Sequence, residues 1–325
     1  MKVLCLSGIE PGGVERLRRL VPQGVEVSTC ATAEDALRCA AEFDVAIGAR
    51  VGGEFLDAAR NLKYLVIPFA GIPARDMEIL RAFARVRVLN SHFNAAHVAE
   101  HAWALLLASV KRLCPIHEKF KRGDWTARYG HVWSDALAGG CLLILGYGAV
   151  GRAIAGIAGC LRVRVRAVKR TPGSAPEIES LGGGEDLHAF LPWADFIIVA
   201  LPGTARTRGL LGRREFELMK QGVHVVNVGR GEVIDEEAFY GALKSGKVAG
   251  AAIDAWWVYP GDEKSRSCTA PSRYPFHEFE NVVFSPHRAS HVRGREEDRI
   301  KDLARILASI AAGAPVNVMD LNEGY

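Results

Sequence analysis

The stretch CLLILGYGAVGR, residues 141–152, decides the fold of this chain. Residues 141–145 form an apolar run with the length of a buried strand, and residues 146–151 supply the pattern GxGxxG. Residues 152–160 continue with small and apolar residues that favour a helix. In a strand–turn–helix of this kind the first glycine makes the tight turn, the second admits a pyrophosphate and the third packs helix against strand. The stretch predicts a dinucleotide-binding turn; a purely structural glycine turn is the alternative.

The start of the following helix would offer unpaired N–H groups and the positive end of its dipole to phosphates. About 20 residues beyond such a loop, NAD-binding proteins carry an acid for the ribose 2′-hydroxyl. This chain has a basic turn there and no acid until Glu177, so a 2′-phosphate is favoured and NADP is preferred over NAD. A solvated basic turn is the alternative. The predicted cofactor contacts are Gly146, Tyr147, Gly148, Ala149, Val150, Gly151, Lys169, Arg170 and Thr171.

Composition narrows the class of protein. The 325 residues suggest two domains, and 49% hydrophobic and 24% charged residues are typical of a globular protein. The net charge is only +4 and no basic run reaches five residues, so we expect no nucleic-acid partner. Seven cysteines without a CxxC pair indicate reduced thiols and a cytoplasmic protein. No apolar run reaches membrane-spanning length, and we expect neither a membrane partner nor a metal site.

Short apolar runs alternate with amphipathic segments over most of the chain. Before residue 95 the expected strands are 3–6, 25–28, 45–47, 64–67 and 86–89. A long helix is expected at 95–121 and a surface loop at 172–184. From residue 141 the expected strands are 142–145, 163–168, 196–200, 224–228, 250–253 and 282–284, and a helix at 294–312 closes the chain.

This alternation predicts an α/β protein with two doubly wound parallel-sheet domains and a cleft between them. Residues 1–95 would begin one domain, 96–290 would form the dinucleotide-binding domain, and 291–325 would return to the first.

Seven stretches resemble, in order and spacing, the NAD(P)-dependent D-isomer-specific 2-hydroxyacid dehydrogenases. They are FAGIPARD (69–76), NAAHVAEHAWALLLAS (94–109), LILGYGAVGRAI (143–154), ADFIIVALPGTARTRGLL (194–211), VVNVGRGEVIDEEAF (225–239), AAIDAWW (251–257) and NVVFSPHRAS (281–290). The resemblance implies hydride transfer between NADP(H) or NAD(H) and a 2-oxo acid or D-2-hydroxy acid. It also implies that residues 1–95 and 291–325 form a flavodoxin-like substrate domain and that 96–290 form a Rossmann cofactor domain. The family is usually homodimeric through its cofactor domains, so a homodimer is expected.

The resemblance also assigns roles to particular residues. Arg230, whose planar fork suits a carboxylate and a carbonyl oxygen, would bind the substrate, and His287 would be the general acid and base. An ordinary surface arginine and a structural histidine are the alternatives. The substrate carboxylate would be bound by Ala70, Gly71, Ile72 and Asn94. Asp254 would hold the nicotinamide carboxamide, and Leu201, Pro202, Thr207, Val228, Gly229 and Ala289 would line the same cofactor site.

Tyr259 departs from the family pattern. Most members carry an acid there that hydrogen-bonds the catalytic histidine and raises its pKa, whereas the related formate dehydrogenases use glutamine. A neutral tyrosine could orient His287 but could not stabilise an imidazolium by charge, so we expect the pKa of His287 to be lower than is usual in the family. Tyr259 as plain packing, and Glu263 as a substitute acid, are alternatives.

Two further points stay open at this level. Trp256 and Trp257 would either select a bulky 2-oxo acid or pack in a core or subunit interface. The missing acid also keeps a nicotinamide-binding, co-repressor-like regulatory protein as a rival function. A dehydrogenase for another small anion such as formate is a second rival, although phosphite enzymes carry lysine where this chain has Ala70.

Overall fold

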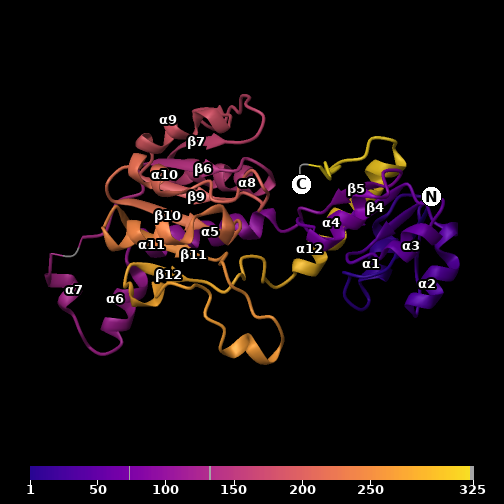
Figure 1. Ribbon diagram of the computed structural model, residues 1–325, viewed down its shortest axis with the longest axis horizontal. Coiled ribbons are helices and arrows are strands. Elements are labelled where there is room, and N and C mark those ends of the chain that lie inside the picture. Colours follow the sequence, from indigo (N-terminus) through magenta and orange to yellow (C-terminus); the bar gives the residue numbers. More distant parts are fainter. Residues whose placement is uncertain (73, 132, 323–325) are drawn as a thin grey trace. The chain divides into compact units, whose positions relative to one another are not determined.

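The computed structural model describes residues 1–72, 74–131 and 133–322. The chain divides into two compact units (Figure 1). Unit 1 comprises Met1–Asn94 with Val292–Tyr325, and unit 2 comprises Ala95–His291. Each unit is built on one parallel sheet.

Unit 1 contains the sheet order β2-β1-β3-β4-β5, with every pairing parallel. Its strands are β1 (Lys2–Cys5), β2 (Glu26–Thr29), β3 (Val45–Ile47), β4 (Tyr64–Ile67) and β5 (Arg87–Asn90). This order is the flavodoxin-like one.

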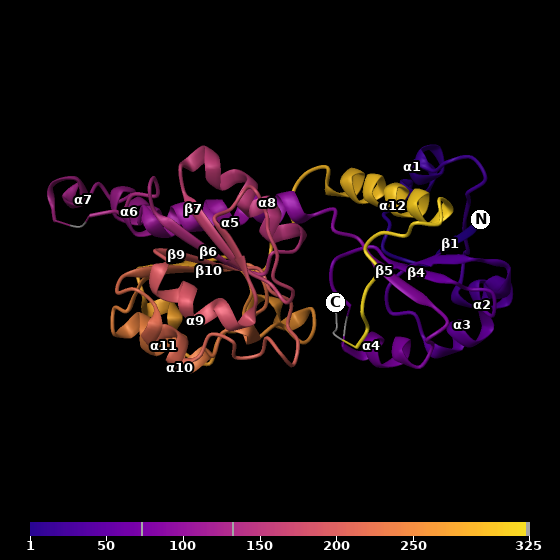
Figure 2. The same cartoon turned by 90° about the horizontal axis from the view of Figure 1, so that it is seen from above.

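Helices cover both faces of this sheet (Figure 2). On one face lie α1 (Gly13–Leu20) and α12 (Arg295–Ala311), and on the other lie α2 (Ala33–Cys39), α3 (Gly53–Ala58) and α4 (Ala74–Arg81). Successive strand residues point to opposite faces, so Val3 packs under α1 and α12 while Leu4 packs under α2 and α3. Burial on both faces explains why these strands are continuous apolar runs.

Unit 2 contains the order β12-β11-β10-β9-β6-β7-β8, again all parallel. Its strands are β6 (Cys141–Leu145), β7 (Arg164–Val168), β8 (Ser180–Gly182), β9 (Phe196–Val199), β10 (Val223–Asn227), β11 (Val248–Ile253) and β12 (Val282–Phe284). The order in which strands are added to the sheet reverses between β6 and β9. Ligands of such sheets bind at the carboxyl ends of the strands beside that point.

The helices of unit 2 also form two layers (Figure 2). One face carries α5 (Ala95–Val110) and α8 (Ala149–Ala158). The other carries α9 (Leu187–Phe190), α10 (Arg213–Leu218) and α11 (Glu236–Lys244). Short 3₁₀ turns occupy Ala40–Glu42, Gly159–Leu161, Gly184–Asp186, Leu191–Trp193, Gly231–Val233, Lys264–Ser267 and Phe276–Glu278. The two-sheet architecture agrees with the expectation from the sequence.

The predicted helix at 95–121 is wrong in one respect, because it is two helices. α5 ends at Val110, Arg112 takes the left-handed conformation with φ 51°, and α6 (Leu113–Phe120) begins after it. Pro115 explains the break. Inside a helix its ring would clash with the carbonyl of the residue four positions earlier, whereas proline is tolerated in the first turn of a helix. A short helix, α7 (Thr126–Tyr129), follows.

The predicted surface loop at 172–184 is also wrong in part. Residues Ser180–Gly182 form β8, which pairs with β7 at the edge of the sheet. The strand is short and ends in glycine, so its own propensity is weak, and pairing with β7 forms it. Among the described residues no helix is long and apolar enough to cross a membrane, and no group of three or more His, Cys, Asp or Glu side chains could hold a metal ion.

Candidate active site

The glycine loop lies between β6 and α8. Gly146 has φ 101°, and a Cβ on it would meet the Ala200 carbonyl oxygen at 2.7 Å. A Cβ on Gly151 would meet the Gly146 oxygen at 2.0 Å, so α8 approaches β6 as closely as backbone allows. Gly148, the N-cap of α8, has open space where a Cβ would be. Gly146 thus makes the tight turn, Gly151 allows close packing, and Gly148 leaves the start of α8 open to a ligand. A pyrophosphate needs these three features, so the loop fits a dinucleotide.

The basic turn follows β7, the strand next to β6. The Gly146 N–H donates to the Val168 carbonyl at 2.9 Å, which puts Lys169, Arg170 and Thr171 directly after a residue that contacts the glycine loop. The Lys169 N–H donates to the Gly182 carbonyl of β8, and the side chains of Arg170 and Thr171 are exposed. The turn therefore presents positive charge at the carboxyl edge of the sheet.

Tyr147 and Glu177 meet beside the glycine loop. The buried Tyr147 donates its hydroxyl proton to the Glu177 carboxylate, and burial raises the pKa of Tyr147. The same hydrogen bond lowers the pKa of Glu177. Glu177, the first acid after the basic turn, therefore contacts the glycine loop through a hydrogen bond that the sequence did not indicate.

Leu201, Pro202 and Thr207 belong to the loop after β9. The Thr207 hydroxyl donates to the Pro202 carbonyl at 2.6 Å and accepts the Thr204 N–H, so it stabilises its own loop. A Cβ on Gly229 would meet the Leu201 oxygen at 2.5 Å. The segments after β9 and β10, including Val228, therefore pack backbone to backbone.

Arg230 follows β10 on a segment organised by Asn227. The buried Asn227 amide accepts the Gly229 N–H at 3.1 Å and donates to the carbonyls of Arg230 and Ala255. A Cβ on Gly231 would meet the Trp256 oxygen at 2.2 Å, so only glycine fits there. Arg230 itself is exposed. Asn227 was missed by sequence reasoning, although an amide ending a buried β-branched strand is a usable signal.

His287 has a left-handed backbone, φ 53°, just after β12. Non-glycine residues rarely adopt this region, and surrounding contacts must stabilise it. Here the buried Asp254 carboxylate accepts the N–H groups of the two residues that follow the histidine, Arg288 at 2.9 Å and Ala289 at 3.2 Å. The contact does not exclude the expected carboxamide role for Asp254, because a carboxylate has about four acceptor positions.

Ser285 and His101 complete this network. The Ser285 hydroxyl donates to Asp254 at 2.5 Å, and His101 Nε2 on α5 lies 2.9 Å from the same hydroxyl. His101 Nε2 is also 3.6 Å from Asp254 Oδ1. Sequence reasoning missed both residues, because their partners lie far away in the chain.

Tyr259 contacts His287 directly: its hydroxyl oxygen lies 2.5 Å from His287 Nδ1. The same oxygen accepts the Trp256 backbone N–H at 3.1 Å. A hydrogen bond at Nδ1 orients the ring and leaves Nε2 as the nitrogen that can gain and lose a proton. Desolvation, followed by the Arg230 charge, lowers the pKa of His287, and burial raises the pKa of Tyr259.

Trp256 and Trp257 pack in an aromatic core. Trp256 is 5% exposed, stacks on Phe284 with ring centres 4.9 Å apart, and donates its indole N–H to the Ser285 carbonyl at 2.8 Å. Trp257 stacks on Phe276 and donates to the Ile234 carbonyl. Both tryptophans therefore pack in a core, as the second of the two alternatives for them predicts. Trp256 also connects the segments that carry Tyr259 and His287.

The predicted carboxylate loop lies in unit 1, after β4. Asn90, the buried last residue of β5, donates its amide to the Ala70 carbonyl at 2.7 Å. Gly71 and Ile72 follow and are partly exposed, as is Asn94 just before α5. Neighbouring strands β4 and β5 thus bring both segments to the carboxyl edge of the unit 1 sheet. Asn90 is a further positioning residue that the sequence alone did not reveal.

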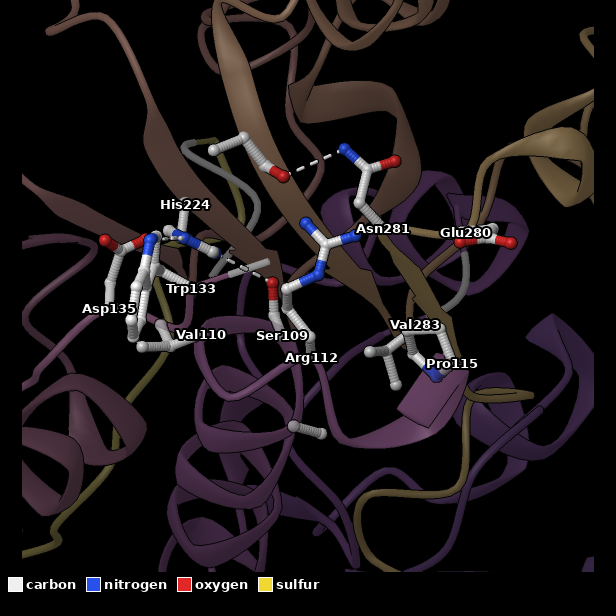
Figure 3. Close-up of a pocket in the computed structure, with 12 residues that line it drawn as sticks. Ser109, Val110, Arg112, Pro115, Trp133, Asp135, His224, Glu280, Asn281 and Val283 are labelled. Atoms are coloured by element: carbon white, nitrogen blue, oxygen red, sulfur yellow. Dashed lines mark hydrogen bonds and ion pairs between the residues drawn. The ribbon is translucent and has the colours of Figure 1, made fainter. Parts of the chain in front are cut away.

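A separate small pocket lies at the amino ends of β10 and β11 (Figure 3). It is far along the sheet from the glycine loop, since all strands are parallel. In it His224 lies between Ser109, 2.9 Å from Nδ1, and Asp135, 3.2 Å from Nε2. Burial lowers the pKa of His224. The pocket lies at the base of α6 and α7 and is no part of the predicted site.

Comparison with known proteins points the same way as the geometry. The family model described as D-isomer specific 2-hydroxyacid dehydrogenase, NAD binding domain, matches residues 103–289. The D-3-phosphoglycerate dehydrogenase of Archaeoglobus fulgidus is 31% identical over 322 residues, which are 97% of this chain and 58% of that protein. This chain thus spans little more than half of that relative.

Two other proteins match over more than three quarters of both chains. The glyoxylate reductase of Thermococcus gammatolerans is 30% identical over 272 residues, covering 81% of this chain and 78% of that one. A D-isomer specific 2-hydroxyacid dehydrogenase from Xanthobacter autotrophicus Py2, solved with NADPH and MES, superposes with a TM-score of 0.78 at 24% identity, covering 100% and 99% of the two chains. This last similarity concerns the fold.

Proposed function

We propose that this chain, which belongs to the D-isomer specific 2-hydroxyacid dehydrogenase family of NAD(P)-dependent oxidoreductases, reduces a 2-oxo acid with NADPH and catalyses the reverse oxidation. The single observation that carries the proposal is the contact between Tyr259 and His287, because it engages Nδ1 and leaves Nε2 to gain and lose the proton. A panel of glyoxylate, hydroxypyruvate, pyruvate and phenylpyruvate, followed by NADPH and NADH absorbance, tests it. Absence of turnover with every acid would overturn it.

Each residue has a defined task in this proposal. The bound nicotinamide supplies or accepts the hydride. Arg230 binds the substrate carboxylate and carbonyl oxygen, and positive charge there stabilises the developing alkoxide. Protonated His287 delivers the Nε2 proton to that oxygen during reduction, and neutral His287 removes it during oxidation. The N–H groups of Ala70, Gly71 and Ile72, with Asn94, bind the carboxylate.

The contact between Tyr259 and His287 supports the enzyme over the regulatory rival. A protein that only senses the cofactor has no need of a histidine whose ring is oriented by a hydrogen bond at Nδ1. Formate and other small anions belong in the same assay as outcomes that would change the substrate class. We place the protein in the cytoplasm, in keeping with its free cysteines.

Tyr259→Glu is expected to move the pH profile of reduction. Reduction needs protonated His287, so turnover is full below its pKa and falls as the pH rises through it. Because desolvation lowers that pKa, the wild-type decline should begin below the ordinary value of about 6.5. A carboxylate at 259 should raise the pKa, which shifts the decline upward by about 1 unit or more.

The matched control is Tyr259→Phe, which removes the hydroxyl without adding charge. Its decline should not move upward. Profiles of kcat for both variants and the wild type, recorded with one 2-oxo acid, provide the measurement. An unchanged midpoint in Tyr259→Glu would mean that residue 259 does not govern the titration of His287.

The double change Lys169→Ala and Arg170→Ala is expected to weaken NADPH binding selectively. Loss of charge-assisted hydrogen bonds to a 2′-phosphate should raise the KM for NADPH by about 10–100-fold. The KM for NADH should change little, because that cofactor has no phosphate there. Lys244→Ala, an exposed cation on α11, is the control. Equal losses for both cofactors would argue against a 2′-phosphate site.

We also propose a homodimer, supported by an apolar surface on one part of unit 2. Residues 111–131 and 133–140, here called the arm, contain α6 and α7 and project from the body of the unit (Figures 1 and 2). Lys111, at the start of the arm, donates a hydrogen bond to the Asp135 carbonyl, and the Asp135 carboxylate contacts His224 on β10. Large exposed apolar areas on a globular protein usually mark an interface. The arm exposes Leu113, Phe120, Trp125, Tyr129 and Trp133. Sedimentation of the full chain measures its oligomeric state.

A further inference from the structure

Two cysteines of unit 1 lie side by side at an edge of its sheet. Cys30 directly follows the edge strand β2, and Cys39 is the last residue of α2. Only Cys30, Ala31 and Thr32 separate the strand from the helix, and the Thr32 hydroxyl accepts the Asp35 N–H at 3.1 Å to cap that helix. The helix therefore turns back so that its last residue meets the end of the strand.

The two sulfur atoms are 3.3 Å apart. A disulfide needs a separation of about 2.05 Å, so they have to approach by little more than 1 Å. Each thiol donates or accepts only weak hydrogen bonds: the two share one, and Cys39 also donates to the Ala36 carbonyl at 3.7 Å. Within the described residues, neither thiol makes a strong polar contact that has to be broken before a bond forms between them.

Both side chains are partly exposed, so a small oxidant can reach them. Burial, helped by Cys39, raises the pKa of Cys30 to about 11. Little thiolate is then present at neutral pH, so the reaction should be slow although its product is close at hand. In the described residues this is the one place where two cysteine sulfurs are in hydrogen-bond contact; Cys5 and Cys141 are buried, and Cys114, Cys160 and Cys268 are exposed.

We propose that Cys30 and Cys39 form a reversible disulfide when the protein meets a disulfide oxidant such as oxidised glutathione. The thiolate of one cysteine attacks a glutathione sulfur and releases one glutathione thiolate, leaving a mixed disulfide. The thiolate of the other cysteine attacks the protein sulfur of that mixed disulfide and releases the second. The two cysteines lose two electrons and two protons, and one oxidised glutathione becomes two reduced molecules.

The bond would join β2 to the far end of α2 and close a ten-residue loop. Cross-linking lowers the entropy of the unfolded chain, so the melting temperature of the oxidised protein should exceed that of the reduced protein. The pair is remote in sequence from the residues assigned to catalysis. The proposal therefore stands or fails independently of the proposed enzyme activity.

Peptide mapping tests the proposal on the full chain. Trypsin cleaves after Arg19, Arg38 and Arg50, so Cys30 and Cys39 fall in separate peptides, residues 20–38 and 39–50. After incubation with oxidised glutathione and alkylation of the remaining thiols, these peptides should be found joined. Alkylated cysteines should drop from seven to five, and dithiothreitol should restore seven.

Three variants sharpen the result. Cys30→Ser and Cys39→Ser should each abolish the joined peptides and the rise in melting temperature. Cys160→Ser, which removes an exposed thiol elsewhere, should keep both. Recovery of all seven cysteines as alkylated or singly glutathionylated residues, with residues 20–38 and 39–50 never joined, would overturn the proposal.

Discussion

His287→Asn is expected to lower kcat for 2-oxo acid reduction by about 10²–10⁴-fold, the usual contribution of a positioned general acid. The Nε2 of His287, which is left to gain and lose a proton while Nδ1 contacts Tyr259, has no counterpart in an asparagine amide, which does not titrate. Asparagine is the informative replacement because it also tolerates the left-handed backbone found at this position. Steady-state rates with NADPH and the best acid of the panel provide the measurement.

Two controls separate chemistry from folding in that experiment. NADPH affinity and the melting temperature of His287→Asn should stay close to the wild-type values, because Asp254 still holds the neighbouring N–H groups. His277→Asn, an exposed histidine on a 3₁₀ turn, should retain full activity. Wild-type turnover in His287→Asn would remove this residue from the mechanism.

Arg230→Gln is expected to lower kcat/KM by about 10²–10⁴-fold. Two charge-assisted hydrogen bonds are lost, each contributing about 1.5–3 kcal/mol, and a factor of ten corresponds to about 1.4 kcal/mol. Arg230→Lys keeps the charge but not the planar fork, so its loss should be smaller and should fall partly on KM. Kinetics of both variants with one 2-oxo acid measure the split.

Arg214→Lys, an exposed change on α10, is the matched control and should leave the kinetics unchanged. The local structure favours a clean result, since Asn227 fixes the backbone around residue 230 whatever its side chain. If Arg230→Gln and the wild type had equal kcat/KM, the substrate would have to be bound by other residues.

Much of the fold was predictable because its signals are local. The buried strands are continuous apolar runs, and the glycine pattern needs only residues 146–151 to be recognised. The break after α5 and the strand β8 were not predicted. Pro115 is local evidence for the break, but the helical periodicity of the apolar residues outweighs it. Strand β8 forms because it pairs with β7, although its own sequence has low strand propensity.

The supporting contacts of the candidate site were beyond sequence reasoning for a different reason. Asn90 reaches Ala70 across 20 residues, Asp254 reaches Arg288 across 34, and His101 reaches Ser285 across 184. No spacing rule connects such pairs, and each side chain is an ordinary polar residue in its own segment. The same holds for Cys30 and Cys39, whose nine-residue separation matches no common motif.

The left-handed backbone at His287 has a consequence for how this protein could change. An L-residue in that conformation costs about 1–2 kcal/mol relative to glycine, which adopts it freely. Stability and proton transfer therefore favour different residues at position 287. Selection for heat resistance alone would favour glycine at 287 and discard the acid, whereas selection for turnover retains a residue that the backbone disfavours.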